Sequence, residues 1–266
     1  MMKSNKAIKF FKYSGFGNDF ILFDHLQSEF NKKSIDILKL CDRNFGIGSD
    51  GIIYLSKQNN LYKMDIYNRD ASKATMCGNA LISLTKHIID SKYESNNFQI
   101  LTDFGLYDVG EIEDKYFFIS SKPKVLKLNH QIQIDDMDLN LHIINSGNFH
   151  ACLFVKNLKE INIEEIAKKI RNSKSLKHLP LNVNFIEMEN NNINVRVFEN
   201  GLNKETLACG TGALAVSYVI KKLFNKGKLL KINFLKGEYE IDFSYKKNKV
   251  KFISNASFVF FGEIVL

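Results

Sequence analysis

Two of the four cysteines in this 266-residue chain occupy matching positions, and their chemistry stands out. Cys77 lies in the segment T-M-C-G-N-A-L and Cys209 in T-L-A-C-G-T-G-A-L, each just before a long apolar stretch. Cys41 and Cys152 lie inside apolar stretches, and we expect both to be small buried side chains. No Cys-x-x-Cys pair or histidine at zinc-ligand spacing accompanies the cysteines, so we predict no metal site.

Both cysteines directly precede the start of a predicted helix. Gly78–Asn79 follows Cys77, and Gly210–Thr211 follows Cys209. The N–H groups at a helix start carry positive potential and bind anions such as a carboxylate, and glycine lets a ligand approach the backbone closely. The same potential lowers the pKa of a cysteine thiol, so we expect both sulfurs to be competent bases. One such position is typical of a nucleophilic thiol enzyme, whereas two matching ones predict a single pocket with a sulfur on each side.

Two opposed sulfurs provide what is needed to invert a stereocentre. One thiolate removes the α-proton from one face of an amino acid, and the opposite thiol delivers a proton to the other face. Two helix N-termini in a closed pocket would stabilise the carbanion. Because the Rossmann and Walker spacings are absent, we predict racemisation or epimerisation without a cofactor.

The elements that must position these cysteines repeat between two halves of the chain. The repeated elements are a strand (7–13 and 140–146), an amphipathic helix (about 32–42 and about 162–173), two strands (about 51–56 with 61–67, and about 182–188 with 193–198) and a second helix (about 78–91 and about 210–225). The second helices are apolar on nearly all sides, which predicts that they are buried. We therefore predict an α+β fold of two pseudo-symmetric halves. Each half is a curved mixed β-sheet or barrel around a central buried helix, with the active site in the cleft between them.

Composition argues against several other classes of protein. The net charge is +8, but only four of the 37 basic residues are arginines and the lysines are scattered, which disfavours a nucleic-acid-binding module. No stretch resembles a signal peptide or a membrane-spanning segment. We expect a cytoplasmic enzyme with a small amino-acid substrate, no nucleic-acid or membrane partner, and a possible homodimer.

The sequence resembles the diaminopimelate epimerase family over essentially its whole length. The segments that carry the resemblance are Lys12–Phe20, Arg43–Gly51, Asn68–Ser72 leading into Met76–Asn79, Gly147–His150, Asn182–Phe185 and Glu205–Gly212. The resemblance implies two pseudo-symmetric halves, residues 1–122 and 123–257, with a last strand at about 258–266 that returns to the first half.

The same resemblance assigns expected roles to individual residues. Cys77 and Cys209 take the catalytic roles, and His150 and Glu199 lie near the reacting centre. The expected substrate-binding residues are Asn18, Asn68, Asn148, Asn182 and Asn200, together with the backbone N–H groups of Gly78, Asn79, Gly210 and Thr211 at the α-carboxylate.

Departures from the family pattern concern substrate recognition. The family has Glu-Arg-Gly where this chain has Glu199-Asn200-Gly201, and that arginine is expected to hold the distal carboxylate of diaminopimelate. Asn200 cannot neutralise a buried carboxylate, and an unpaired one costs on the order of 3–5 kcal/mol. A second family arginine is Ile82 here. We therefore favour an amino acid without a distal carboxylate, for example histidine or another polar or basic amino acid.

Three other functions stay open. A guanidinium displaced to Arg69 or Arg196 would restore diaminopimelate, or its analogue lanthionine, as the substrate, with a place in lysine or peptidoglycan biosynthesis. A proline or hydroxyproline racemase also uses paired cysteines, but usually has histidine where this chain has Asn79. An isomerase of the phenazine-biosynthesis type lacks the cysteine pair.

Overall fold

The computed structural model describes residues 7–190 and 192–265, and this part of the chain divides into two compact units. Unit 1 consists of residues 7–119 and 254–265, and unit 2 of Ser120–Ile253. The chain therefore passes between the units three to four residues earlier than the boundaries expected after 122 and 257. The expected ends at residues 1 and 266 lie outside the described residues. No helix in the described part is long and apolar enough to cross a membrane.

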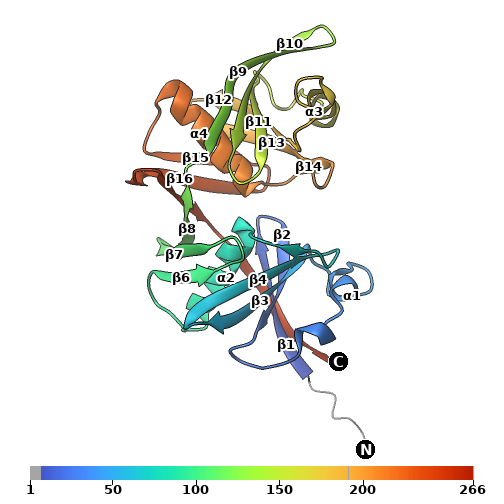
Figure 1. Cartoon of the computed structure of the whole chain (residues 1–266), viewed down its shortest axis with the longest axis vertical. Coiled ribbons are helices and arrows are strands. Elements are labelled where there is room, and N and C mark those ends of the chain that lie inside the picture. Colours follow the sequence, from blue (N-terminus) through green and yellow to red (C-terminus); the bar gives the residue numbers. More distant parts are fainter. Residues whose placement is uncertain (1–6, 191, 266) are drawn as a thin grey trace, which may run out of the picture. The chain divides into compact units, whose positions relative to one another are not determined.

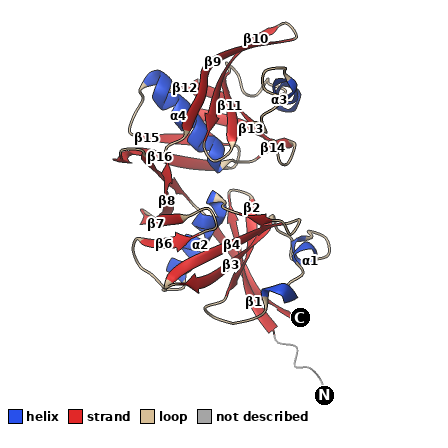
Figure 2. Ribbon diagram, in the orientation of Figure 1, coloured by secondary structure: helices blue, strands red, loops and turns tan. Residues whose placement is uncertain are grey.

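Unit 1 is a mixed sheet with one long helix (Figures 1 and 2). Its elements are β1 (Ala7–Gly15), β2 (Asn18–Asp24), η1 (Lys32–Ser34), α1 (Ile37–Cys41), β3 (Gly51–Gln58), β4 (Leu61–Asn68), β5 (Lys73–Ala74), α2 (Gly78–Asp90), β6 (Phe98–Leu101), β7 (Leu106–Ile112), β8 (Lys115–Ser121, which runs into unit 2) and β18 (Ser257–Val265). The strands pair in the order β18, β1, β2, β3, β4, β6, β7, and β8 follows β7. The β2–β3 and β4–β6 pairs are parallel and the others antiparallel.

Unit 2 is built from the same series of elements. They are β9 (Lys124–Ile134), β10 (Met137–Asn145), β11 (Phe149–Phe154), α3 (Ile163–Asn172), β12 (Asn182–Glu189), β13 (Asn192–Glu199), β14 (Lys204–Thr206), α4 (Gly210–Phe224), β15 (Leu229–Phe234), β16 (Gly237–Lys246) and β17 (Lys249–Ser254). The strands pair in the order β9, β10, β11, β12, β13, β15, β16, β17. Here β11–β12 and β13–β15 are the parallel pairs.

The two strand orders are the same once equivalent strands are matched. In unit 1 the pairs β1–β2, β2–β3, β3–β4 and β4–β6 are antiparallel, parallel, antiparallel and parallel in turn. In unit 2 the pairs β10–β11, β11–β12, β12–β13 and β13–β15 follow the same alternation, and antiparallel strands end both series. The short strands β5 and β14 each pair with the strand before them, and each lies just before the long helix. The predicted fold of two pseudo-symmetric α+β halves is confirmed at this level of topology.

The long helices α2 and α4 are each packed against several strands of their own unit. Helix α2 contacts β1, β2, β3, β4 and β7, and helix α4 contacts β10, β11, β12, β15 and β16. The side chains that are completely buried include Ala80, Leu81, Leu84 and Ile88 in α2, and Ala213, Ala215, Val216, Val219 and Ile220 in α4. Apolar residues on nearly all sides produce such a central helix because every side meets a strand.

The first helix of each unit differs between prediction and structure. Helix α3 agrees with the predicted range of about 162–173. The continuous helix predicted at about 32–42 is wrong, because the structure has the short η1 and then α1. The Asn31 side chain accepts the Lys33 N–H at 3.0 Å and the Asp36 side chain accepts the Lys39 N–H at 3.0 Å. Such side-chain acceptors begin helices, so Asp36 starts a new helix where the apolar periodicity predicted a continuing one.

Candidate active site

Cys77 and Cys209 are the N-cap residues of the two central helices. Their backbones are extended, with φ of −144° and −141°. The Cys77 carbonyl accepts the Leu81 N–H at 2.9 Å, and the Cys209 carbonyl accepts the Ala213 N–H at 2.9 Å. The first N–H groups of a helix have no backbone carbonyl one turn earlier to bond with, so they point past its end. The predicted placement of both cysteines at helix starts is confirmed.

The glycine after each cysteine is explained by packing against an aromatic ring. A Cβ added to Gly78 would lie 3.3 Å from the Phe118 ring of β8, and one added to Gly210 would lie 3.3 Å from the Phe252 ring of β17. Strands β8 and β17 are equivalent in the two units. Each helix start therefore lies so close to an aromatic ring that a residue without a side chain fits there best.

Two of the expected substrate-binding residues lie beside Cys77. The Asn18 carbonyl oxygen is 3.7 Å from the Cys77 sulfur, and the Asn79 side-chain amide donates to the same oxygen at 3.3 Å. Asn18 begins β2 and Asn79 is the second residue of α2, so the strand and the helix meet at this sulfur. Asn68 ends β4, is exposed, and donates to the Ser72 hydroxyl at 2.9 Å.

A chain of hydrogen bonds leads to the Cys209 sulfur. The Asn184 side-chain nitrogen donates to the Ala151 carbonyl at 3.3 Å. Because a carbonyl can only accept, this side of the Asn184 carboxamide is its NH2 group, which also donates to His150 Nδ1 at 3.0 Å. With Nδ1 as acceptor, the His150 proton is on Nε2, 3.0 Å from Thr211 Oγ1. The Thr211 hydroxyl, whose oxygen accepts this proton, can donate its own proton to the Cys209 sulfur, 3.5 Å away.

Asn184 was not among the predicted site residues. It lies two residues after Asn182 on β12, and alternate residues of a strand share one face, so this spacing was the available signal. Its partner His150 is completely buried, and burial lowers the pKa of this imidazole to about 3. The neutral ring therefore links Asn184 to Thr211 as a hydrogen-bond bridge.

The surroundings of Cys209 correct one expectation. Burial raises the pKa of the Cys209 thiol to about 12, and the negative charge of Glu199 adds to the effect. The Thr211 hydroxyl and the N–H groups of Thr211 and Gly212 act in the opposite direction. The lowered pKa predicted from the helix start is therefore wrong for Cys209 in the free protein, because loss of water around a charged sulfur outweighs these donors.

Three more of the expected residues lie at the end of β13 or contact the loop that follows it. Glu199 accepts the Thr206 hydroxyl at 2.6 Å, and burial raises the pKa of its carboxyl. The Asn182 side-chain oxygen accepts the Asn200 N–H at 2.8 Å, which joins the start of β12 to this loop.

The expected residue Asn148 is exposed in the turn between β10 and β11. The Ser146 hydroxyl in this turn donates to the Thr211 carbonyl at 2.7 Å, so the turn is bound to the start of α4.

The two arginines expected as alternative sources of a displaced guanidinium, Arg196 and Arg69, lie in different surroundings. Arg196 is held by both carboxylate oxygens of Glu205, at 2.6 and 2.7 Å, and donates to the Leu158 carbonyl at 2.7 Å. Arg69 is exposed. Arg171 of α3, which sequence analysis did not single out, donates to the side-chain oxygens of Asn200 and of Asn203, the latter at 2.9 Å.

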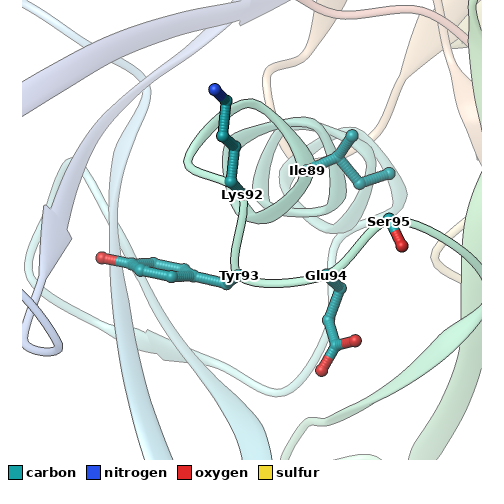
Figure 3. A pocket seen from close by; sticks show the side chains of 5 residues that line it. All are labelled: Ile89, Lys92, Tyr93, Glu94 and Ser95. Atoms are coloured by element: carbon teal, nitrogen blue, oxygen red, sulfur yellow. The ribbon is translucent and has the colours of Figure 1, made fainter.

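A hollow lined by Ile89, Lys92, Tyr93, Glu94 and Ser95 lies at the end of α2 (Figure 3). The thirteen residues of α2 separate it from Cys77 by about 20 Å, so it is not part of the candidate site. No group of three or more His, Cys, Asp or Glu side chains in residues 7–190 and 192–265 has an arrangement suited to a metal ion.

Comparison with known proteins identifies relatives over most of the chain. The sequence model of the family described as diaminopimelate epimerase matches residues 10–116 and 142–257. Diaminopimelate epimerase from Methanothrix thermoacetophila is 35% identical, with 90% of each chain covered. The enzyme of the same name from Methanocella arvoryzae is 32% identical, with 89% of this chain and 98% of that one covered.

Solved structures share the fold at low sequence identity. A Bacillus anthracis phenazine biosynthesis protein of the PhzF family has a TM-score of 0.75 at 14% identity, covering 98% of this chain and all of that one. A hydroxyproline epimerase from Agrobacterium vitis has a TM-score of 0.71 at 11% identity, covering all of this chain and 94% of that one. Together with the match to the family over both units, these findings show that the chain belongs to the diaminopimelate epimerase family and is an isomerase of the class that epimerises or racemises amino acids.

Proposed function

We propose that the chain inverts the α-carbon of a free amino acid with Cys77 and Cys209 as its two proton-transfer groups. The observation that supports this most directly is the equivalence of the two sulfurs. Each caps the central helix of its unit with the same backbone conformation, in units of the same topology. Inversion of a carbon needs one acid–base group on each of its two faces. Two similar units, each with an equivalent cysteine, can provide such a pair.

In the proposed reaction one sulfur begins as a thiolate and the other as a thiol. The thiolate takes the α-proton from one face of the substrate, and the opposite thiol gives its proton to the other face. The product leaves with inverted configuration, and the sulfurs have exchanged protonation states. The N–H groups of Gly78–Asn79 and Gly210–Thr211 bind the α-carboxylate, where negative charge builds up as the proton departs.

Binding of an amino acid brings a positive charge into the surroundings of Cys209. A thiol with a pKa near 12 is a poor source of thiolate, but an α-ammonium group nearby favours the charged form of the sulfur. The Thr211 hydroxyl, oriented by His150, adds a donor on the same side. Ionisation of this thiol therefore accompanies occupation of the site by an amino acid.

For the substrate we propose diaminopimelate, which carries a second carboxylate. The support is the name of the relatives at 32–35% identity and the position of Arg171 against Asn200. Arg171 lies with its guanidinium carbon 5.5 Å from the centre of the Phe198 ring, and no carboxylate in the described chain pairs with it. A guanidinium held by two amide oxygens and lacking a counter-ion is suited to a distal carboxylate.

The second candidate substrate is an amino acid without a distal carboxylate, which the sequence alone favours. Asn200 and Ile82 stand where the family has arginines, and Arg196 is already paired with Glu205. Histidine is the example to test. The two candidates share the reaction and differ in the group that the loop of Asn200 recognises.

A substrate panel tests the proposal. Purified enzyme is given single stereoisomers of diaminopimelate, lanthionine and histidine, and formation of the opposite configuration is followed by chiral chromatography. We expect the highest kcat/KM for diaminopimelate. Inversion of histidine with no turnover of diaminopimelate would transfer the assignment to the second candidate, and inversion of no amino acid would contradict the proposed reaction.

Substitution of Arg171 tests the recognition of the distal carboxylate. Loss of a charge-assisted hydrogen bond costs about 1.5–3 kcal/mol, so Arg171→Gln is expected to raise the KM for diaminopimelate by about 10- to 100-fold with a smaller change in kcat. Lys169→Gln is the matched control, since it removes one positive charge of the same helix that is paired with Asp135 and Glu165. Equal KM values in both variants would contradict this role for Arg171.

A further inference from the structure

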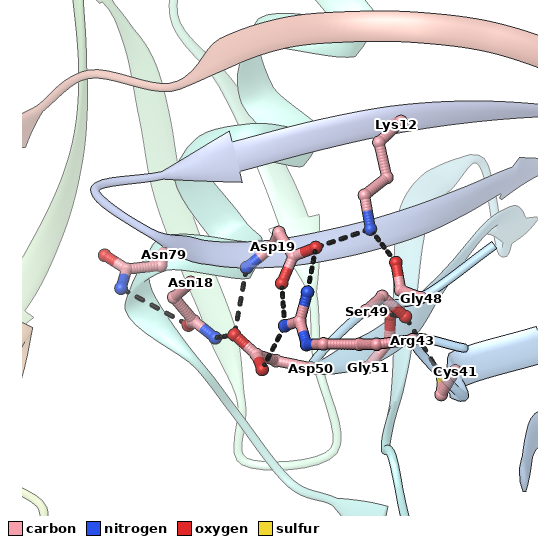
Figure 4. Close-up of polar contacts among 10 residues, drawn as sticks. All are labelled: Lys12, Asn18, Asp19, Cys41, Arg43, Gly48, Ser49, Asp50, Gly51 and Asn79. Atoms are coloured by element: carbon pink, nitrogen blue, oxygen red, sulfur yellow. Dashed lines mark hydrogen bonds and ion pairs between the residues drawn. The ribbon is translucent and has the colours of Figure 1, made fainter. Parts of the chain in front are cut away.

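An ion-pair cluster of Lys12, Asp19, Arg43 and Asp50 lies beside Asn18 (Figure 4). Through Asn18 the cluster is linked to Cys77. The Arg43 guanidinium donates to both carboxylate oxygens of Asp19, at 2.7 Å (Oδ1) and 3.3 Å (Oδ2). It also donates to Asp50 Oδ1 at 2.8 Å. Lys12, which is buried, pairs with Asp19 and donates to the Gly48 carbonyl. Two positive and two negative side chains thus hold β1, β2 and the loop before β3 together.

Asp19 remains ionised because the positive charges around it compensate its own charge. Burial alone would raise the pKa of Asp19, but the hydrogen bonds and charges of Arg43 and Lys12 outweigh it and lower this pKa. Asp19 therefore keeps Arg43 in place, and Arg43 in turn fixes the carboxylate of Asp50.

The second oxygen of Asp50 faces Asn18. Asp50 Oδ2 accepts the Asn18 side-chain amide at 3.1 Å and the Asp19 backbone N–H at 3.2 Å. The same oxygen accepts a backbone N–H, which can only donate, so Asp50 Oδ2 acts as an acceptor and the side of the Asn18 carboxamide that faces it is the NH2 group. This chemical argument fixes an orientation that the positions of similar atoms alone would leave open.

With its NH2 group toward Asp50, Asn18 must present its carbonyl oxygen to the other side. That oxygen lies 3.7 Å from the Cys77 sulfur, and the Asn79 amide donates to it at 3.3 Å. A carbonyl oxygen accepts a hydrogen bond from a thiol, whereas a thiolate would meet its lone pairs. The neighbour of Cys77 therefore favours the sulfur that carries a proton.

The neighbour of the other sulfur has the opposite polarity. The hydrogen-bond chain from Asn184 through His150 leaves the Thr211 hydroxyl to donate to Cys209. This donor favours the thiolate, although burial and the charge of Glu199 act more strongly against it. The two sulfurs are therefore equivalent in backbone geometry and different in side-chain surroundings.

We infer that Asp50 is a positioning residue that turns the Asn18 carbonyl toward Cys77 and thereby favours the protonated form of this sulfur. The inference rests on the proposed two-thiol function for its catalytic meaning. The orientation itself depends only on the contacts among Asp50, Asn18 and Cys77.

The pH dependence of Cys77 alkylation tests the orientation. The full-length Cys209→Ala protein is treated with iodoacetamide over a range of pH, and modification of Cys77 is quantified by peptide mass spectrometry. Asp50→Asn lets the Asn18 amide turn, and it is expected to move the midpoint of the alkylation profile to lower pH by about 0.5–1 unit, the size of one hydrogen bond to a neutral acceptor. Asn18→Ala removes the carbonyl acceptor and should move the midpoint in the same direction.

A double-mutant cycle separates positioning from the charge of Asp50. If Asp50 acts through Asn18, the double variant shifts no further than Asn18→Ala alone. If the full effect of Asp50→Asn persists in the Asn18→Ala background, the carboxylate acts directly on the sulfur and the inference is overturned. Asp42→Asn removes a negative charge from the same loop and leaves the Asp50–Asn18 contact in place, so it should shift the midpoint less.

The outcome stays decisive if a variant is unstable or if the proposed function fails. Circular dichroism identifies folded variants, and if Asp50→Asn does not fold, an unchanged or raised midpoint in Asn18→Ala overturns the inference. Alkylation requires no turnover, so the result stands even if the substrate panel finds no substrate. With turnover, the alkaline limb of the kcat/KM profile of Asp50→Asn should move to lower pH by the same amount.

Discussion

Single residues divide the work of the candidate site between proton transfer and hydrogen bonding. His150 is completely buried and neutral, held by Asn184 on one side and Thr211 on the other. An imidazole whose pKa has fallen to about 3 cannot serve as an acid near neutral pH. The proposed proton transfers are therefore left to the sulfurs, and His150 orients the donor that faces Cys209.

The buried imidazole makes a specific prediction for stability in acid. The pKa of His150 is about 3 in the folded protein and near 6.5 when unfolded, so between these values the unfolded state binds one more proton. Stability is then lost as pH falls below about 6.5, with a slope from this group of roughly 1.4 kcal/mol per pH unit. His150→Gln is expected to remove that part of the slope, measured by urea unfolding between pH 4 and pH 6.

The control for this measurement is a histidine in a different environment. His178 is exposed, so His178→Gln should leave the slope as it is in the wild type. A slope that is the same in His150→Gln and in the wild type would show that the imidazole is protonated in the folded protein.

Sequence reasoning found the residues whose chemical type is unusual and missed those whose role depends on register. Cys77 and Cys209 stand out by repetition, but Asn184 comes into contact with His150 only because β11 and β12 pair in parallel. Asp50 and Arg171 were missed for a related reason. Their partners Asn18 and Asn200 lie about thirty residues away in the chain, and no local pattern encodes such a contact.

Among the elements, the loop between α1 and β3 connects the core to the candidate site. It carries Arg43 and Asp50, which hold Asn18, and it turns back at Gly46. A Cβ at Gly46 would lie 2.0 Å from the Lys39 carbonyl oxygen and 2.8 Å from that of Leu40. Backbone oxygens of a helix end cannot move aside as a flexible side chain can.

Gly46→Ala is therefore expected to destabilise the protein by about 1–3 kcal/mol, the usual cost of overpacking. The control is Gly201→Ala, since a Cβ at Gly201 would have no atom within 4 Å and its effect should stay within about 0.5 kcal/mol. The free energy of unfolding from urea titration measures both. A Gly46→Ala protein as stable as Gly201→Ala would mean that the loop can open without cost.

The elements that sequence reasoning placed well are those with a strong period. The apolar central helices and the strands that precede them begin within a residue or two of the predicted positions. Helix α1 was predicted poorly because the cap at Asp36 competes with the apolar period, and only the structure shows which of the two prevails.

At the level of the whole molecule, the repeated series of elements supports the two-sulfur proposal. Two Cys-Gly turns half a chain length apart were enough to predict two similar halves. The strand order could not be predicted, because paired strands such as β4 and β6 are separated in the chain by a helix and no local sequence pattern identifies the partner strand. The last strand, β18, pairs with the first, β1, so the chain closes unit 1 with residues from both of its ends.

The central claim, that two different sulfurs treat opposite faces of one α-carbon, is tested most directly by hydrogen exchange during the first turnovers. One stereoisomer of diaminopimelate is incubated with the enzyme in deuterated water, and substrate and product are separated and analysed by mass spectrometry. The account predicts that the product carries one solvent deuterium at the inverted carbon while the remaining substrate is unlabelled, and that Cys77→Ala and Cys209→Ala each abolish inversion. Product that retains the original hydrogen, or substrate that gains deuterium as fast as the product does, would contradict it.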